Sequence, residues 1–318
     1  MAQFKRPPKK HINGIILLNK PVGPSSNGVL QQVMRLFNAK KGGHTGALDP
    51  FATGLLPICL GEATKVSGLL LDSDKRYTAT LKLGVQTDTG DKEGHVIHNM
   101  EVPSLTKEST QNALLGFMGA IKQVPPMYSA LKHQGKPLYY YARQGIEIER
   151  SARSIVIKQL NLLSFTGDTI VFDVQCSKGT YVRTLGEDIA IALGTVGHLT
   201  ALHRTQAGEL SGDDMLTIEE IESQKMDCIH PIDIALTNLQ RFDLSKEEVD
   251  LIQHGQMLPY PKPNAEFVRL YDEGVCFAVG EWSEKKQMIK PRRVFNLHLA
   301  ESEEKAEAVV KQVWETAP

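Results

Sequence analysis

The sequence predicts an α+β fold, with a mixed but largely antiparallel central sheet, flanking helices and a second, smaller β-rich domain. Strand-like and helix-like segments are mixed without the regular strand-helix-strand repeat of a doubly wound sheet. The 318 residues are 41% hydrophobic, which is enough for one large domain and one small domain. Neither a G-x-G-x-x-G fingerprint nor a Walker loop occurs, so the usual nucleotide cofactors have no support in the sequence.

Five elements are expected in the first third of the chain. Residues 14–20 have the composition of a strand, and the loop after them offers a Ser or Asn cap to a helix over 29–37. Residues 55–60 are apolar and predicted to be buried, and 62–71 are predicted to be helical. Residues 77–83 alternate in polarity, which is typical of a strand with one buried face.

The remaining elements suggest where a second domain begins. Helices are predicted over 106–118 and 182–193, and strands over 155–163, 169–176, 267–271 and 275–280. Thr106 is a candidate N-cap, with Glu108 in the first helical turn. After an acidic stretch at 219–227, and beyond about residue 241, the sequence changes to short strand-like segments flanked by turn residues. We therefore predict a larger domain over 1–245 and a small domain with an acidic tail over 246–318.

Positive charge is concentrated at the N-terminus. The whole chain carries −1, whereas its first 48 residues contain eight Lys or Arg and no acid, so residues 49–318 carry −9. Such asymmetry predicts a surface that faces a polyanion, although a basic N-terminal arm can also be only a solvated tail.

The cysteines indicate a reducing compartment. The four have no C-x-x-C spacing and two lie in apolar runs, so neither a zinc site nor a disulfide framework is predicted. The N-terminus lacks an apolar signal region, and no run approaches the ~20 residues that cross a bilayer. We expect a cytoplasmic protein without a membrane partner.

The first carboxylate of the chain, Asp49, lies within GGHTGALDPFATG, residues 42–54. Glycine-containing backbone allows a substrate to approach closely, and the following proline biases Asp49 toward extended geometry. This context favours a reactive carboxylate. An Asx turn ahead of a proline is the alternative.

Two further segments carry candidate functional residues. In residues 123–153, four tyrosines are interleaved with lysines and arginines, a composition that suits single-stranded or looped RNA or, alternatively, a surface hairpin. In CSKGTYVRTLGEDIA, Tyr181 and Arg183 are expected to face one cleft, where the arginine would lower the pKa of a carboxylate. A structural ion pair or a phosphate anchor are the alternatives for Arg183. By residue type alone, Leu202 is a core residue.

Four sequence blocks together resemble one family. KPVGPSSN, GGHTGALDPFATGLLPICLGEATK, DSDKRYTATLKLG and CSKGTYVRTLGEDIA, in this order and spacing, are similar to the bacterial tRNA pseudouridine synthase B family (TruB) over residues 11–205. Beyond residue 241 the chain more weakly resembles a small PUA-like RNA-binding module. The resemblance implies the pseudouridine synthase fold and an isomerase that converts uridine-55 in the tRNA T loop to pseudouridine. It implies no metal, organic cofactor or guide RNA, and we expect a monomer.

The resemblance also assigns roles to residues. Asp49 matches the essential catalytic residue, as a nucleophile at C1′ or as a base that removes the 2′ proton, and the sequence leaves both routes open. Arg183 matches the charge partner of that aspartate. Tyr77 matches a tyrosine that stacks on the target base and helps remove the C5 proton.

Further positions match substrate contacts of the family: His44, Tyr181, Leu202, Lys20 and Lys65. His44 is expected to fill the space that the flipped base leaves. The two lysines are expected to be structural or phosphate-facing, so that their loss would weaken RNA binding more than chemistry. Residues 123–153 fall where the family has an RNA-gripping insertion.

Two other functions remain as alternatives. One is an RNA-folding factor that uses the same grip without turnover, and the other is a guide-RNA-dependent rRNA synthase of the dyskerin type. The acidic tail, residues 301–318, is helical in composition and is not expected to touch RNA.

Overall fold

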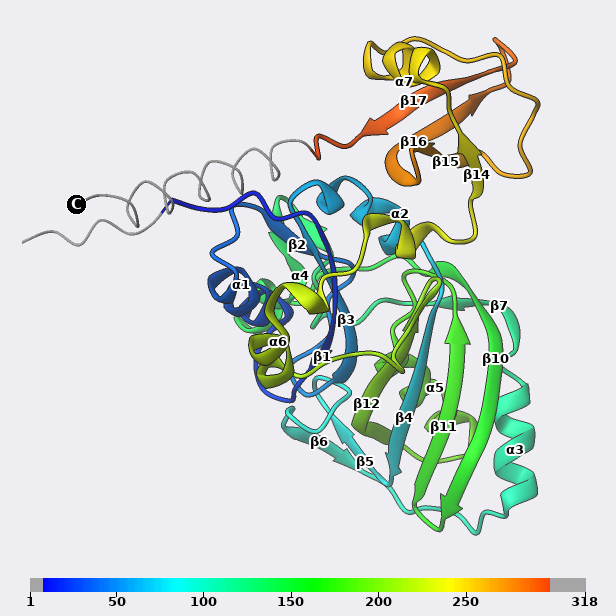
Figure 1. The fold of residues 1–318 in the computed structure, drawn as a ribbon. Helices are drawn as coiled ribbons and strands as arrows, with labels where there is room; N and C mark the ends of the chain where they lie inside the picture. The colour runs from blue at the N-terminus through cyan, green and yellow to red at the C-terminus, as the bar shows by residue number, and fades with distance from the viewer. Residues whose placement is uncertain (1–7, 298–318) are drawn as a thin grey trace, which may run out of the picture.

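The computed structural model of the chain describes residues 8–297, which form a large mixed sheet with helices and a small C-terminal sheet (Figure 1). The large sheet has nine strands, seven of them in the order β1-β3-β12-β4-β11-β10-β7. β2 pairs with β3, and β13 pairs with β12. The pairing is antiparallel except between β3 and β12. The predicted α+β fold with a largely antiparallel sheet is confirmed.

The strands of the large sheet are β1 (Gly14–Lys20), β2 (Gly42–His44), β3 (Thr53–Leu60), β4 (Lys75–Leu83), β7 (Gly119–Gln123), β10 (Arg153–Thr166), β11 (Thr169–Cys176), β12 (Gly197–Ala207) and β13 (Leu210–Ser211). The helices beside it are α1 (Ser26–Leu36), α2 (Ser67–Leu71), α3 (Lys107–Leu115), α4 (Leu138–Ala142), α5 (Val182–Ala192) and α6 (Ile218–Gln224). Two small hairpins pair β5 (Val85–Thr87) with β6 (Val96–Asn99) and β8 (Lys132–His133) with β9 (Lys136–Pro137). Ser25 caps α1 and Thr106 caps α3 through their side chains, as the sequence predicts.

At its β1–β3 side the large sheet is buried on both faces, because alternate strand residues enter different hydrophobic clusters. In β1, Ile16 and Leu18 share a cluster with residues of α1, α3, α5 and α6. Ile15 and Leu17 belong to a second cluster, which also contains Tyr271 of the C-terminal sheet. The small domain is therefore packed directly against the large one.

The small domain contains β14 (Gln240–Asp243), α7 (Lys246–Gln253), β15 (Phe267–Asp272), β16 (Val275–Ser283) and β17 (Met288–Val294). Its sheet runs β14-β15-β16-β17, and β14 pairs in parallel with β15 just before the predicted boundary at 245/246. The acidic tail and the first seven residues of the basic stretch lie outside the described residues.

The predicted helix over 62–71 is two shorter elements. A 3-10 helix, Gly61–Lys65, precedes α2. The hydroxyls of Thr64 and Ser67 each donate to a carbonyl three residues earlier, which favours the tighter winding.

The strand β12 was not predicted as an element, although Leu199 and Leu202 within it are buried core residues, as expected by type. Two irregularities in its pairing with β4 interrupt the alternation that marks a strand in a sequence. Among residues 8–297, no helix has the length and hydropathy to cross a membrane. All four cysteines are buried and unpaired.

Candidate active site

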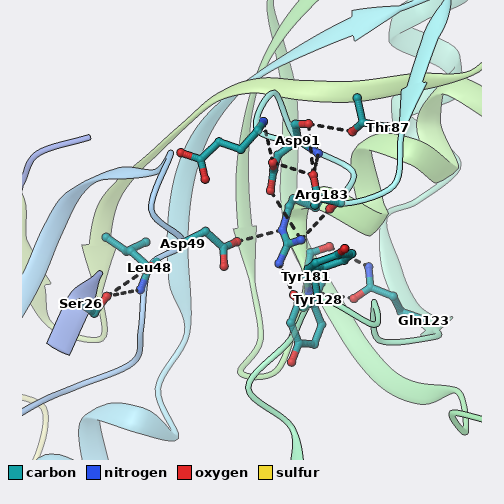
Figure 2. Close-up of polar contacts among 11 residues, drawn as sticks. Ser26, Leu48, Asp49, Thr87, Asp91, Gln123, Tyr128, Tyr181 and Arg183 are labelled. Carbon is teal, nitrogen blue, oxygen red and sulfur yellow. Dashed lines mark hydrogen bonds and ion pairs between the residues drawn. The ribbon is translucent and has the colours of Figure 1, made fainter. Parts of the chain in front are cut away.

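The loop that carries Asp49 joins β2 to β3 and is fastened to the first residue of α1. The hydroxyl of Ser26 donates to the carbonyl of Leu48 at 3.0 Å and accepts the Leu48 N–H at 2.8 Å (Figure 2). Ser26 is 3% exposed. The backbone next to Asp49 is therefore held by a buried pair of hydrogen bonds.

Lys20, at the end of β1, holds the same loop from inside. Its side chain is fully buried, and its ammonium donates to the carbonyls of Pro21 at 2.9 Å, Pro50 at 3.2 Å and Ala52 at 2.8 Å. Burial lowers the pKa of Lys20 to about 8, against the opposing effect of the Asp49 carboxylate. Three carbonyls occupy its ammonium, which favours the structural interpretation of Lys20. The contact of Lys20 with the substrate stays a prediction.

Arg183, in the first turn of α5, reaches Asp49 from the opposite side. Its Nε lies 2.9 Å from Asp49 Oδ2, and its side chain is 4% exposed, whereas that of Asp49 is 40% exposed. The two terminal nitrogens donate to the carbonyls of Thr89 at 2.6 Å and Tyr128 at 2.7 Å. Figure 2 shows this guanidinium between the Asp49 loop and the segments of its other partners. Arg183 therefore forms the expected ion pair with a carboxylate, and that carboxylate is Asp49.

A second carboxylate, Asp91, lies 3.6 Å from Nη1 of Arg183 and is 5% exposed. It accepts hydrogen bonds from the Thr89 hydroxyl at 2.8 Å and the Glu93 N–H at 3.0 Å. The sequence interpretation named Asp49 as the candidate carboxylate and did not identify Asp91. In sequence, TDTGDKEG has only the composition of a polar turn, and the turn itself gives no sign that it packs against α5.

The pKa of Asp49 is raised above its ordinary value of 3.8. Burial of the carboxyl is the largest cause, and the Arg183 guanidinium opposes it, while the charge of Asp91 raises the pKa further. We expected the arginine to lower this pKa. It does so, but the loss of solvation outweighs it, so that the net direction is upward.

Tyr77 of β4 lies opposite Arg204 of β12 in the sheet. Burial raises the pKa of Tyr77, and the neighbouring Arg204 guanidinium opposes the rise. Arg204 is 1% exposed and donates to the carbonyls of Leu55 at 2.7 Å and Gly46 at 3.0 Å. Gly54 must be a glycine, since its φ is +97° and a Cβ there would lie 2.4 Å from the Arg204 carbonyl oxygen. No pattern in the sequence singled out Arg204.

Tyr181 is fixed by a glutamine far away in the chain. The side-chain oxygen of Gln123 accepts the Tyr181 N–H at 2.8 Å, and its nitrogen donates to the Tyr181 carbonyl at 3.1 Å. Gln123 is 3% exposed and ends β7, where the basic and aromatic segment begins. Tyr181 is also the N-cap residue of α5, so this bridge links that segment to the helix of Arg183.

The other predicted site residues occupy three different places. His44 of β2 is half-buried with an unpaired Nδ1, and burial and Arg204 lower its pKa, so that its ring is neutral near pH 7. Leu202 of β12 is 7% exposed in the core. Lys65 pairs with Glu62 at 2.5 Å and donates to the Val294 carbonyl at 2.7 Å.

Lys65 therefore joins the two domains. Glu62, its partner, also accepts the N–H of Asn296 at 2.7 Å. Both groups bind the end of β17 and the residues just after it, and the ammonium of Lys65 is committed to these contacts. These contacts favour the structural interpretation of Lys65, and its contact with the substrate stays a prediction.

The segment 123–153 presents aromatic rings and cations together. Tyr139 and Tyr140 of α4 are each 42% exposed. The Lys136 ammonium lies 4.3 Å from the ring centroid of Tyr140, and the Arg143 guanidinium lies 5.6 Å from that of Tyr139. Exposed rings beside cations are suited to stacking on bases and binding phosphates.

Models of one family match most of the chain. They are described as TruB family pseudouridylate synthase (N terminal domain), over residues 34–182, tRNA pseudouridylate synthase B C-terminal domain, over 183–237, and Pseudouridine synthase II TruB, C-terminal, over 241–295. A tRNA pseudouridine synthase B of Hydrogenovibrio crunogenus is 61% identical over 288 residues, which cover 90% of this chain and 95% of that protein. The chain belongs to the bacterial tRNA pseudouridine synthase B family. A second member, from a Marinomonas species, is 49% identical over 90% of this chain and 96% of its own.

Solved structures agree on the fold of this tRNA pseudouridine synthase B family member. A chain from the crystal structure of a Cbf5-Nop10-Gar1 complex superposes with a TM-score of 0.70 at 24% identity, covering 90% of this chain and 86% of the other. A chain from a Nop10-Cbf5 complex has a TM-score of 0.68 at 23% identity, covering 90% and 87%. These likenesses confirm the predicted pseudouridine synthase fold.

The sequence predicted that loss of Lys20 would weaken RNA binding more than chemistry. The buried contacts of Lys20 predict the opposite order of effects. Lys20→Met leaves three carbonyls around the Asp49 loop without their donor, so we expect it to lower the free energy of unfolding by about 3 kcal/mol and to lower the single-turnover rate more than the RNA affinity. Urea unfolding and filter binding measure both. Lys82→Met is the control, because it removes only the exposed ion pair with Asp168. A normal rate with weakened RNA binding would restore the phosphate-facing interpretation.

Proposed function

We propose that Asp49 is the catalytic carboxylate of an enzyme that converts uridine-55 in the T loop of tRNA to pseudouridine. Family membership makes the chain a tRNA pseudouridine synthase, an isomerase. One observation carries the assignment of Asp49. The side chain of Asp49 is 40% exposed, yet its carboxylate lies 2.9 Å from the guanidinium of Arg183, whose side chain is 4% exposed. A reactive group needs such a combination of access and fixed geometry.

The reaction breaks the C1′–N1 bond, rotates the base and forms a C1′–C5 bond while the C5 proton leaves. The target base must first be extruded from the folded loop. The ionised Asp49 acts as the nucleophile at C1′ or as the base at the 2′ position, and both routes use the same atom. Poor solvation makes this carboxylate a stronger nucleophile and base than one in water, while Arg183 keeps its charge compensated.

The residues around Asp49 position the base and the loop. Tyr77 stacks on the extruded uracil and assists removal of the C5 proton. His44 fills the space that the base leaves, and its neutral ring suits that apolar stack. Tyr181 and Leu202 complete the contacts, and the Gln123 bridge that fixes the Tyr181 backbone supports this role.

The two domains have different roles, catalysis in the large domain and RNA binding in the small one. The catalytic domain, predicted over residues 1–245, contains the insertion 123–153 that grips the RNA. β14 (Gln240–Asp243) already belongs to the sheet of the PUA-like RNA-binding domain, which continues through residues 246–318 with an acidic tail. The exposed Tyr139 and Tyr140 with their cations support the grip. The protein acts alone on the T arm, as a cytoplasmic monomer without a guide RNA. Matches to three family models of this type, over residues 34–182, 183–237 and 241–295, support this.

The role of Asp49 can be tested by tritium release from an unmodified tRNA transcript that carries 5-tritiated uridine, with no other RNA or protein. Asp49→Asn is expected to lower the rate by at least about 10³-fold with tRNA affinity little changed, because the ionised carboxylate is lost but its shape is kept. Asp72→Asn is the matched control, since Asp72 is a surface carboxylate with a 70% exposed side chain.

Two results would overturn parts of this proposal. Turnover by Asp49→Asn at the wild-type rate would remove Asp49 from the chemistry. No product from the wild-type protein would show that it needs a guide or a partner. An RNA-folding factor would bind the transcript but release no tritium.

The acidic side of the pH profile should report the pKa of Asp49. Because that pKa is raised and the ionised form reacts, the single-turnover rate should fall with decreasing pH well before an ordinary carboxyl would be protonated. Asp91→Asn removes a negative charge that raises the pKa of Asp49, so this limb should move to lower pH. An unmoved limb, equal to that of the Asp72→Asn control, would show that Asp49 does not set it.

A further inference from the structure

A third carboxyl group, that of Glu187, lies on the same face of α5 as Arg183. The two residues are four positions apart, so their side chains leave the helix one above the other. Glu187 is half-buried, and the mechanism proposed for Asp49 gives it no role. Both side chains lie against the turn between β5 and β6, which carries Asp91.

Glu187 packs on the middle of the turn that supplies the partners of Arg183. Gly90 is buried with a φ of +72°, and a Cβ built on it would lie 3.2 Å from the carboxyl carbon of Glu187. The absence of a side chain there lets the carboxyl rest on the backbone. The residues on either side of Gly90, Thr89 and Asp91, contact Arg183. Neighbouring positions of one turn are thus held by Arg183 and Glu187.

The same carboxyl also contacts the strand that leads into the turn. Gln86, in β5, hydrogen-bonds to Glu187 through its side chain. From β12, the buried ring of His198 bonds to the carbonyl of Val85 at 2.8 Å, one residue before Gln86. Glu187 therefore contacts the segment 86–91 at two points, near each of its ends.

We propose that Glu187 is a positioning residue for the Arg183–Asp49 pair and that it acts as the neutral acid. Ionised, it would be the third negative charge near one buried guanidinium, after Asp49 and Asp91. That charge would attract the guanidinium and repel Asp91, so the contact between Arg183 and Asp49 would weaken. The neutral acid keeps its contacts with the turn without this competition. The inference rests on the proposed role of Asp49.

The surroundings of Glu187 favour the neutral form. Its pKa is raised to about 7, with burial as the largest cause, and the charges of Asp188 and Asp91 raise it further. The hydrogen bond from Gln86 and the guanidinium of Arg183 oppose the rise. The neutral acid is therefore present through weakly acidic pH and is lost as the pH rises above neutrality.

The ratio of two single-turnover rates, that of Glu187→Gln to that of the wild type, tests the proposal on an unmodified tRNA transcript. Glutamine keeps the shape of neutral glutamic acid but cannot ionise, so the ratio should be about 1 near pH 5.5 and rise several-fold above about pH 7. Titrations that both proteins share, such as that of Lys20, cancel in the ratio. Glu108→Gln is the matched control, since Glu108 is exposed in the first turn of α3, and its ratio should not change with pH.

Urea unfolding gives a readout that does not depend on catalysis. Folded Glu187 holds its proton to a higher pH than an unfolded glutamate, whose pKa is 4.5. The stability that this proton contributes is present below that pKa and is lost as the pH rises through about 7. The urea midpoint of the wild type should therefore fall relative to that of Glu187→Gln between these pH values.

Three results would overturn the proposal. A rate ratio that does not change with pH, with the midpoint shift present, would make Glu187 a neutral acid without influence on Asp49. A midpoint difference that does not change with pH would show that folded Glu187 is ionised. A slow Glu187→Gln at every pH would show that the carboxylate itself is needed. Failure of the proposed role of Asp49 is seen separately, as turnover by Asp49→Asn.

Discussion

The catalytic half of this molecule depends on one buried cation, the guanidinium of Arg183. A charge that is 4% exposed is costly unless every donor is paired. Its partners come from three segments far apart in the chain: the Asp49 loop before β3, the turn with Thr89 and Asp91 between β5 and β6, and Tyr128 after β7. Each segment satisfies the cation, and the cation fixes each segment. Asp49, the proposed catalytic carboxylate, and the start of the segment proposed to grip RNA are thereby positioned by one group.

The surroundings of Asp49 set both its reactivity and its place. Burial raises the pKa of its carboxyl and Arg183 opposes the rise, so a poorly solvated charge is kept beside a compensating one. Lys20 adds a second constraint, since its ammonium binds carbonyls on both sides of Asp49 in the chain. Backbone and side chain are thus held independently. The remaining 40% of the side-chain surface is available to a substrate.

Local patterns and motif blocks were enough to predict the α+β class, the boundaries of β1 and β11, a Ser or Asn cap before α1, the cap at Thr106, and the Asp49–Arg183 pair. Contacts between distant segments were not predictable. The roles of three polar residues arise only when their turns and strands pack: Asp91, Gln123 and Arg204. Strand β12 was missed because two bulges in its pairing with β4 interrupt the alternation of buried and exposed residues. The motif lysines show the same limit. That Lys20 and Lys65 match motif positions does not reveal that their ammonium groups donate to backbone carbonyls.

The most direct test of this account is the single-turnover rate of Arg183→Lys, measured together with its dissociation constant for tRNA. Lysine keeps the positive charge but cannot place fixed N–H groups on Asp49, Thr89 and Tyr128 at once. The account predicts a rate at least about 10²-fold lower with tRNA binding nearly unchanged. A wild-type rate, or a loss explained entirely by weaker tRNA binding, would contradict the claim that this guanidinium positions the reactive carboxylate.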